Sequence, residues 1–188
     1  MDARLVIVDG YNLILRSPRL RPGPTRTLRE SRGMLLNLLS WMMGANDTRF
    51  VVVFDGAEDG AHAASESGRV QVLWSRPPEK ADDVIRHLVE KRVGGDEHVT
   101  VVTSDIEVAR HARAEGADVS LADLFLASAL GAGGGLPGES GGGEEADEKP
   151  VSLSKKELEE WAEIFTRRKS GTPAEGTSGP GSGSGSPP

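Results

Sequence analysis

The chain has 188 residues, a formal net charge of −7 and no cysteine. This length suits one folded domain with appendages, and the lack of cysteine excludes disulfides and thiolate metal sites. The negative charge does not exclude nucleic acid, because local patches decide such contacts. The N-terminus has no signal-peptide pattern and no apolar run approaches membrane length. We therefore expect a soluble, cytoplasmic protein without membrane contacts.

The first predicted element is a buried β-strand over residues 5–8, which are all apolar and mostly β-branched. The strand ends on Asp9, and Gly10 and Asn12 are predicted to bend the chain there. An acid at the carboxyl end of a buried strand lies where open α/β sheets bind ligands. A single Asp in this position also commonly serves only to cap a turn.

Strands and helices then alternate along the chain. The prolines of residues 16–24 predict a loop, and Thr27 with Glu30 forms a capping box that opens a helix ending near Gly44. Further strands are predicted over residues 50–54, 70–74, 99–103 and 118–119, and further helices over residues 80–93, 106–114 and 121–130. This alternation predicts an α/β fold with a parallel sheet and helices on both faces.

Composition separates a folded domain from its C-terminal appendages. Residues 1–130 contain all the alternating elements, and residues 131–150 are a Gly- and Glu-rich linker. Residues 151–169 contain an amphipathic helix that would be marginal alone in water, so we expect it to dock. Residues 170–188 are a Gly/Ser/Pro-rich tail that we expect to be disordered.

Four acids are predicted to converge at one edge of the sheet. Asp9, Asp55 and Asp105 each follow a strand, and the carboxyl ends of parallel strands share an edge. In the helix over residues 80–93, Asp82 borders the apolar face while Asp83 points nearly opposite, into solvent. Crowded carboxylates stay ionised only beside a cation, and oxygen ligands favour Mg²⁺ or Mn²⁺. The alternative is four unrelated helix caps and turn acids.

The segment between residues 16 and 32 is rich in arginine. We expect a patch that grips phosphates, or alternatively a solvated face, formed by Arg16, Arg19, Arg21, Arg26 and Arg29. Arg32 falls on the leucine stripe of its helix, and the acids are its expected partner. Ser104 has no evident base and is expected to orient Asp105. Dinucleotide-binding and P-loop motifs do not occur, so no nucleotide cofactor is expected.

Four motifs in order resemble the bacterial YacP-like NYN-domain family of the PIN-like nuclease superfamily. They are V-D-G-Y-N at 8–12, V-V-F-D at 52–55, K-A-D-D-V-I at 80–85 and V-V-T-S-D at 101–105. The resemblance covers about residues 4–130 and implies a PIN-like three-layer sandwich with a mostly parallel central sheet. It also implies a Mg²⁺- or Mn²⁺-dependent endoribonuclease, and a studied relative cuts mRNA on the ribosome. By this resemblance, Asp9, Asp82 and Asp105 match the family's metal-binding acids, and Asn12 matches an Asn that shapes the site. Arg32 matches an Arg in the family's first helix.

Two positions depart from that family pattern. Relatives often carry an acid one turn after the position of Asp82, where this chain has Arg86. Residues 57–68 are short and acidic here, whereas the ribosome-acting relative is basic. The number of metal ions and any dependence on the ribosome are therefore left open.

The sequence as a whole predicts a metal-dependent endoribonuclease that cleaves single-stranded RNA, with mRNA and the ribosome as candidate partners. Asp9, Asp82 and Asp105 are expected to be catalytic and to hold the metal, with Asp55 as an outer ligand. Asn12, Ser104 and Arg32 are expected to support them. The alternative is a non-catalytic RNA-binding or adaptor protein that retains the fold.

Overall fold

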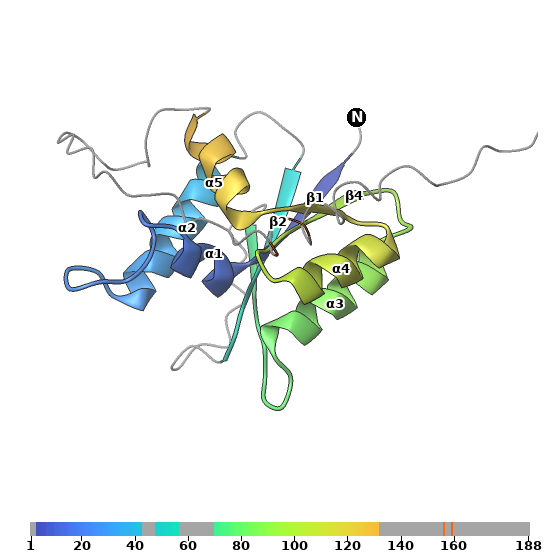
Figure 1. The fold of residues 1–188 in the computed structure, drawn as a ribbon, viewed down its shortest axis with the longest axis horizontal. Helices are drawn as coiled ribbons and strands as arrows, with labels where there is room; N and C mark the ends of the chain where they lie inside the picture. The colour runs from blue at the N-terminus through green and yellow to red at the C-terminus, as the bar shows by residue number, and fades with distance from the viewer. Residues whose placement is uncertain (1–2, 43–47, 57–69, 132–155, 157–158, 160–188) are drawn as a thin grey trace, which may run out of the picture.

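The structure is a computed structural model, and it describes residues 3–42, 48–56 and 70–131 together with Lys156 and Glu159. The described strands form one parallel sheet in the order β3-β2-β1-β4-β5 (Figure 1). The strands are β1 (Arg4–Asp9), β2 (Thr48–Phe54), β3 (Val70–Trp74), β4 (His98–Val102) and β5 (Asp118–Ser120). The helices are α1 (Gly10–Arg16), α2 (Leu28–Met42), α3 (Ala81–Arg92), α4 (Ile106–Glu115) and α5 (Ala122–Gly131).

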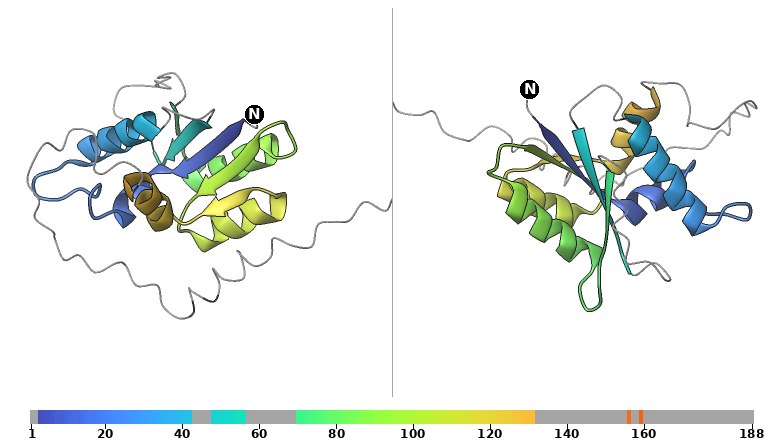
Figure 2. Two further views of the ribbon diagram at one scale, coloured as in Figure 1. Left: turned by 90° about the horizontal axis from the view of Figure 1, so that it is seen from above. Right: turned by 180° about the vertical axis from the view of Figure 1, so that it is seen from behind.

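Helices cover both faces of the sheet. Helices α3 and α4 lie on one face, and α1, α2 and α5 lie on the other (Figures 1 and 2). Alternate strand residues serve the two faces, so Leu5 and Ile7 pack with α3 and α4 while Val8 packs with α1 and α2. The predicted three-layer α/β fold with a parallel central sheet is confirmed.

The chain changes direction across the sheet between β1 and β4. Strands β1, β2 and β3 progress to one edge, and α3 then returns the chain to the far side of β1, where β4 and β5 continue to the other edge. Val8 of β1 lies opposite Val102 of β4. In open parallel sheets, such a switch point leaves a crevice at the carboxyl ends of the strands, where ligands bind.

The start of α1 differs from the sequence prediction. The bend expected after Asp9 is instead the first turn of a helix, Gly10–Arg16. This helix has seven residues, too few for a periodic apolar pattern to reveal it. The capping box predicted for α2 is present, because Thr27 Oγ1 accepts from the Glu30 N–H at 3.2 Å and Glu30 Oε2 accepts from the Thr27 N–H at 2.7 Å.

Helices α2 and α3 each bury an apolar stripe against the sheet. In α2, Leu28 is 37% exposed, whereas Leu38 is fully buried. In α3, Val89 is fully buried alongside Ile85.

Several predicted segments lie outside the described residues. These are the helix end near Gly44, the loop over residues 57–68, the linker, the tail and, apart from Lys156 and Glu159, the helix over residues 151–169. The domain boundaries therefore remain predictions. Within the part of the chain that the structure describes, no helix is long and apolar enough to cross a membrane.

Candidate active site

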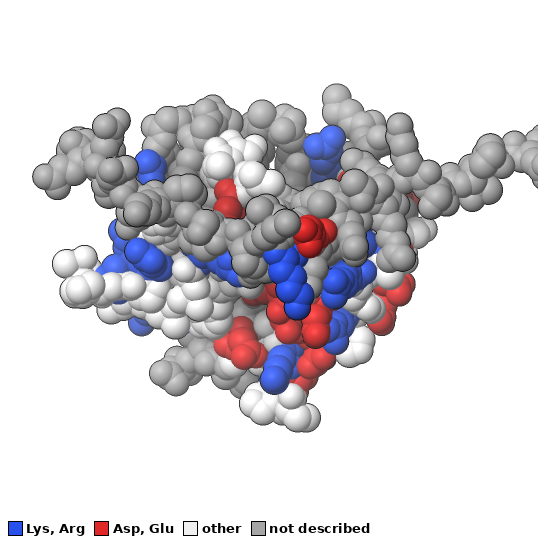
Figure 3. Space-filling model, viewed as in Figure 1, with Lys and Arg blue, Asp and Glu red and all other residues white. Residues whose placement is uncertain are grey.

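Acidic side chains gather at the carboxyl edge of the sheet. Asp9 ends β1, Asp55 follows β2, and Asp105 immediately precedes α4. The N-terminal ends of α1, α3 and α4 meet at this edge (Figure 1), and acidic side chains crowd there in the space-filling view (Figure 3). Asp9 and Asp55 have the strand phase of Ile7 and Val53, so they continue the sheet face that α3 and α4 cover.

Each of these three aspartates also caps a helix. Asp9 Oδ1 accepts a hydrogen bond from the Asn12 N–H at the start of α1, at 3.2 Å. Asp55 Oδ1 accepts from the Ala81 N–H at the start of α3, also at 3.2 Å. Asp105 Oδ1 accepts from the second and third N–H groups of α4, at 2.8 and 3.2 Å. Helix N-termini attract negative charge, so the capping alternative noted from the sequence describes a contact that these acids do make.

The acids are nevertheless not independent caps, because they interact electrostatically. The pKa of Asp9 is raised from 3.8 to about 6, mainly by burial and also by the neighbouring carboxylates of Asp82 and Asp105, against the effect of its hydrogen bonds to Asn12 and Thr103. Burial also raises the pKa of Asp82, with a further rise from Asp105 and smaller ones from Asp83 and Asp55, against an opposing effect from Arg86. The edge is therefore a coupled acidic cluster, which we define as Asp9, Asp55, Asp82 and Asp105.

The neighbours Asp82 and Asp83 have different surroundings. Asp82 interacts with the other members of the acidic cluster. Asp83 Oδ2 accepts a hydrogen bond from the Lys80 N–H at 3.0 Å and so closes the N-terminus of α3. Both side chains are half-buried, so Asp83 is a capping residue of the helix and does not project freely into solvent.

Thr103 is a member of this site that the sequence reasoning missed. Its side chain is fully buried, and its hydroxyl donates to Asp9 Oδ2 at 3.4 Å while accepting from the Asp105 N–H at 3.0 Å. Thr103 therefore joins the ends of β1 and β4. The alternation of strand residues could have revealed Thr103. Thr103 is two residues after Val101, so its side chain points to the same face of the sheet, which is the face that carries Asp9.

Asn12 and Ser104 also bridge the switch point. Asn12 Oδ1 accepts a hydrogen bond from the Ser104 N–H at 2.9 Å. Ser104 is buried, and its hydroxyl has no hydrogen-bond partner among the described residues. The role expected of Ser104, orienting Asp105, is taken by Thr103, whose hydroxyl accepts from the Asp105 N–H. Ser104 instead donates its backbone N–H to Asn12.

Ser75 is a second residue that the sequence reasoning missed. It is 1% exposed, and its hydroxyl donates to Asp55 Oδ1 at 2.6 Å while accepting from the Gly56 N–H at 3.0 Å. This arrangement fixes the chain just after β2. Nothing in the local sequence distinguishes Ser75 from an ordinary strand-end serine, because its partners lie 19 and 20 residues away.

Arg32 lies on α2 and is half-buried. Its Nη1 donates to Tyr11 Oη at 3.0 Å, and its guanidinium carbon lies 5.3 Å from the centroid of the Trp74 ring. The inward orientation predicted from the helical angle is thus present. These contacts are to aromatic side chains at the same edge of the sheet as the acidic cluster.

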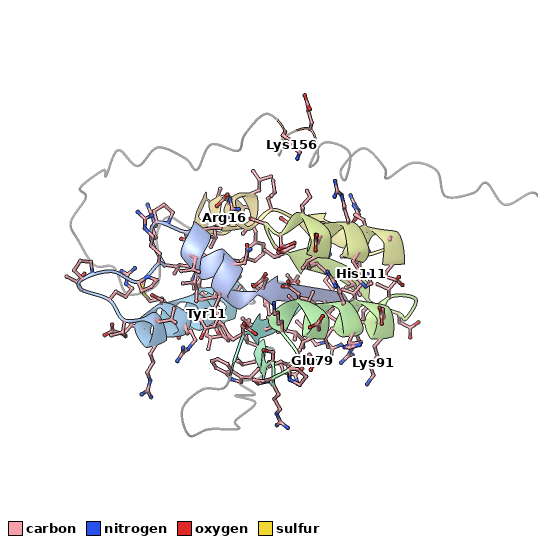
Figure 4. The ribbon with its side chains drawn as sticks, turned by 60° about the horizontal axis from the view of Figure 1, so that its bottom comes forward. Tyr11, Arg16, Glu79, Lys91, His111 and Lys156 are labelled. Atoms are coloured by element: carbon pink, nitrogen blue, oxygen red, sulfur yellow. The ribbon has the colours of Figure 1, made fainter. Side chains whose placement is uncertain are left out.

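The other arginines lie on the last turn of α1, on the loop that joins it to α2, and on the first turn of α2. Arg19, Arg21 and Arg29 are exposed, and Arg16 and Arg26 are half-buried. Basic side chains lie over the side of the molecule around α1 and α2, and others lie among the acids near α3 and α4 (Figure 3); Figure 4 shows Arg16 on α1. Arg26 Nη1 donates to the Arg19 carbonyl oxygen and holds the loop closed.

The donor set of the acidic cluster fits a hard divalent cation in chemical terms. Carboxylate oxygens are the ligands that Mg²⁺ and Mn²⁺ prefer, and a cation would relieve the repulsion that raises the pKa values of Asp9 and Asp82. Among the residues that the structure describes, however, no three His, Cys, Asp or Glu side chains are grouped closely enough to hold a metal ion.

A parallel sheet of this order with acids at its switch point defines a PIN-like α/β domain of the nuclease type. Residues 6–166 match the YacP-like NYN domain, and the chain belongs to that family. The match runs past residue 130 and includes most of residues 151–169, which is further than the motifs alone indicated.

Individual relatives agree with this assignment. The chain is 28% identical over 102 residues to the uncharacterized protein YacP of Bacillus subtilis (strain 168), covering 54% of this chain and 60% of that protein. The crystal structure of Rae1 (YacP) from Bacillus subtilis matches with a TM-score of 0.56 and 27% identity, covering 70% of this chain and 75% of that one. The crystal structure of a tryptophan-to-leucine mutant of Rae1 gives a TM-score of 0.57 at the same identity, covering 68% and 74%.

Proposed function

We propose that this protein is a divalent-metal-dependent endoribonuclease that cleaves single-stranded RNA. The observation that carries the proposal is the electrostatic coupling of Asp9, Asp82 and Asp105, which three different elements bring to the switch point. In a chain of the YacP-like NYN family, such a cluster supports phosphodiester hydrolysis.

The proposed ligands of the cation are Asp9, Asp82 and Asp105, with Asp55 as an outer ligand. When bound, Mg²⁺ or Mn²⁺ would activate a water molecule and neutralise charge on the scissile phosphate. Asp82 lies on α3, and the other two lie on segments where strands end.

Other residues support these ligands through contacts that the chain already makes. Thr103 holds one oxygen of Asp9 and the backbone of Asp105. Asn12 ties the start of α1 to the segment after β4. Arg32 and the exposed arginines beside α1 and α2 would receive the RNA backbone, because guanidinium groups pair well with phosphates.

The alternative is a non-catalytic RNA-binding or adaptor protein. It is favoured by the capping bonds of Asp9, Asp55 and Asp105, which give these acids a structural role without any metal. The two functions differ in a measurable way. A site that binds Mn²⁺ in the folded state must gain stability from it, by about 2.7 kcal/mol at a hundredfold excess over the dissociation constant.

The decisive experiment combines cleavage with thermal melting of the full chain. A labelled single-stranded RNA and the duplex of the same sequence are incubated with the protein in EDTA, Mg²⁺ or Mn²⁺. We expect internal cleavage of the single strand with either metal, none in EDTA, and none by Asp105→Asn. A melting temperature that Mn²⁺ does not raise, together with RNA binding but no cleavage, would establish the adaptor function instead.

The natural substrate is a separate question from the reaction. We propose messenger RNA as the substrate pool, with the ribosome left outside the proposal. Mapping RNA 5′ ends in cells that contain the active protein or Asp105→Asn would identify the cleaved transcripts and the bases around each cleavage site.

A further inference from the structure

Aromatic side chains form a continuous row beside the acidic cluster. The Phe54 ring is 1% exposed, and its centroid lies 5.0 Å from the Tyr11 ring and 5.0 Å from the Trp74 ring. Tyr11 and Trp74 are only half-buried, so part of each ring remains at the surface. We call Tyr11, Phe54 and Trp74 the aromatic row.

Arg32 connects the two half-exposed rings of this row. Its guanidinium carbon lies 5.3 Å from the Trp74 ring centroid, and its Nη1 donates to Tyr11 Oη at 3.0 Å. A guanidinium beside aromatic rings adds a positive charge to a surface on which a base can stack. This combination suits a nucleotide, whose base stacks and whose phosphate is negative.

The row and the acids lie at the same carboxyl edge of the sheet, on opposite faces. Trp74 is paired with Phe54 at the carboxyl ends of β3 and β2, and Asp55 follows Phe54 in the chain. Tyr11 comes two residues after Asp9, in the first turn of α1 (Figure 4). The aromatic row therefore lies on the face covered by α1 and α2. The acidic cluster lies at the same edge, on the face covered by α3 and α4.

Gly10 makes this proximity possible. A Cβ atom at Gly10 would lie 2.4 Å from Phe54 Cε1, well inside van der Waals contact. Only a glycine lets the first turn of α1 approach the Phe54 ring so closely. The close approach brings the Tyr11 ring onto Phe54 while Asp9 stays at the sheet edge.

Trp74 also carries an unsatisfied donor. Its indole Nε1 is buried and has no hydrogen-bond partner among the described residues. Buried indole N–H groups normally have an acceptor.

We propose that Tyr11, Trp74 and Arg32 form a subsite that binds one unpaired nucleobase of the substrate by stacking. The inference rests on the proposed function and names the part of the RNA that is recognised. Bases within a duplex already stack on their neighbours, whereas single-stranded bases are free to stack on protein rings. The subsite would therefore select single strands and place the adjoining phosphate beside the acidic cluster.

The first test uses Trp74 as its own reporter. The chain has three tryptophans, so the double variant Trp41→Phe, Trp161→Phe keeps only Trp74. In EDTA, which prevents cleavage, we expect a short single-stranded RNA to quench its fluorescence. An abasic ribose-phosphate strand of the same length should bind through its charge without that quenching. Equal quenching by both strands, or none by RNA that is shown to bind, would overturn the subsite.

The second test measures affinity by fluorescence polarisation for the same two strands. Trp74→Leu should weaken binding of the RNA about tenfold, within the range for one stacked base, and leave the abasic strand unchanged. Trp74→Phe keeps a ring and should lose less, and Trp41→Leu, at a 45% exposed position on α2, is the matched control. Equal loss for both strands in a folded Trp74→Leu would show a structural role only.

The two proposals fail separately in these assays. Cleavage by the wild type with Mn²⁺, together with unchanged RNA affinity in Trp74→Leu, would overturn the base subsite and leave the nuclease standing. Base-dependent binding without cleavage in any metal would overturn the nuclease and leave the subsite standing.

Discussion

The Thr103 hydroxyl donates a hydrogen bond to Asp9 across the junction of β4 and β1, at 3.4 Å. The same oxygen accepts from the Asp105 N–H at 3.0 Å. Thr103→Val removes both bonds while keeping the shape of the side chain. We expect a stability loss of about 1–3 kcal/mol from the unpaired groups. We also expect Mn²⁺ affinity to fall about 10- to 100-fold, as when a group that orients a metal ligand is removed.

Thr100→Val is the matched control for this change. Thr100 lies on the same strand, is half-buried and is away from the carboxyl edge. Calorimetric titration with Mn²⁺ and denaturant unfolding should separate the two variants. Unchanged metal affinity in Thr103→Val would show that this hydrogen bond does not position the ligands.

Asp9→Asn should make the metal-free protein more stable at neutral pH. The pKa of Asp9 is raised from 3.8 to about 6 in the folded state, so ionising this carboxyl opposes folding. Its contribution to stability is present in full below pH 4 and is lost as the pH rises through about 6. We expect a gain of up to about 3 kcal/mol at pH 7 to 8, which disappears near pH 4.

Urea unfolding in EDTA across this pH range measures the effect of Asp9→Asn. Asparagine can still accept the capping hydrogen bond at the start of α1, so the helix should survive. Asp83→Asn serves as the control, because its carboxylate caps α3 by a similar bond. A variant of Asp9 that is less stable than the wild type at pH 7 would contradict the electrostatic account.

Asp82→Asn and Asp83→Asn should differ in cleavage. Asp82 interacts with Asp105 and Asp9, whereas Asp83 bonds to the backbone of Lys80. We expect Asp82→Asn to reduce the single-turnover rate at least about a hundredfold, a barrier increase of about 3 kcal/mol. Asp83→Asn should stay close to the wild-type rate. A larger rate loss in Asp83→Asn than in Asp82→Asn would mean that the face of α3 that carries Asp82 is not the one at the site.

Gly10→Ala should destabilise the fold. The added methyl group would lie 2.4 Å from a ring atom of Phe54, which is held in the core, and such overpacking costs about 1–3 kcal/mol. Gly33→Ala is the control, because Gly33 lies within α2 with no atom within 4 Å of the added methyl group. Helix propensity predicts that Gly33→Ala stabilises the fold by about 1 kcal/mol. The melting temperature should therefore fall in Gly10→Ala and rise in Gly33→Ala.

The exposed arginines should govern the salt dependence of RNA binding. Changing Arg19, Arg21 and Arg29 to Ala should weaken binding to all single-stranded sequences alike. Removing one arginine–phosphate pair should reduce the slope of log K against log salt by about 0.7. Lys91→Ala, near the end of α3 (Figure 4), is the control and should leave the slope unchanged. An unchanged slope in the triple variant would mean that the RNA enters elsewhere.

The sequence predicted the parts of this site that follow a strand or helix period. The positions of Asp9, Asp55 and Asp105 could be inferred because each follows a predicted strand, and parallel strands share an edge. Thr103 and Ser75 could not, because their roles depend on partners that only the folded chain brings near. Helix α1 was missed because one short helix, opened by an acid and a glycine, has the local sequence of a turn.

The helix-capping bonds of Asp9, Asp55 and Asp105 also limit how this chain can change in evolution. Replacing any of them by an apolar residue removes a charge from the edge and loosens a helix in the same step. Asparagine is the substitution that discards the charge and keeps the cap. A descendant that has lost activity without losing its fold is therefore expected to carry Asn at these positions, a signature that can be read from sequence alone.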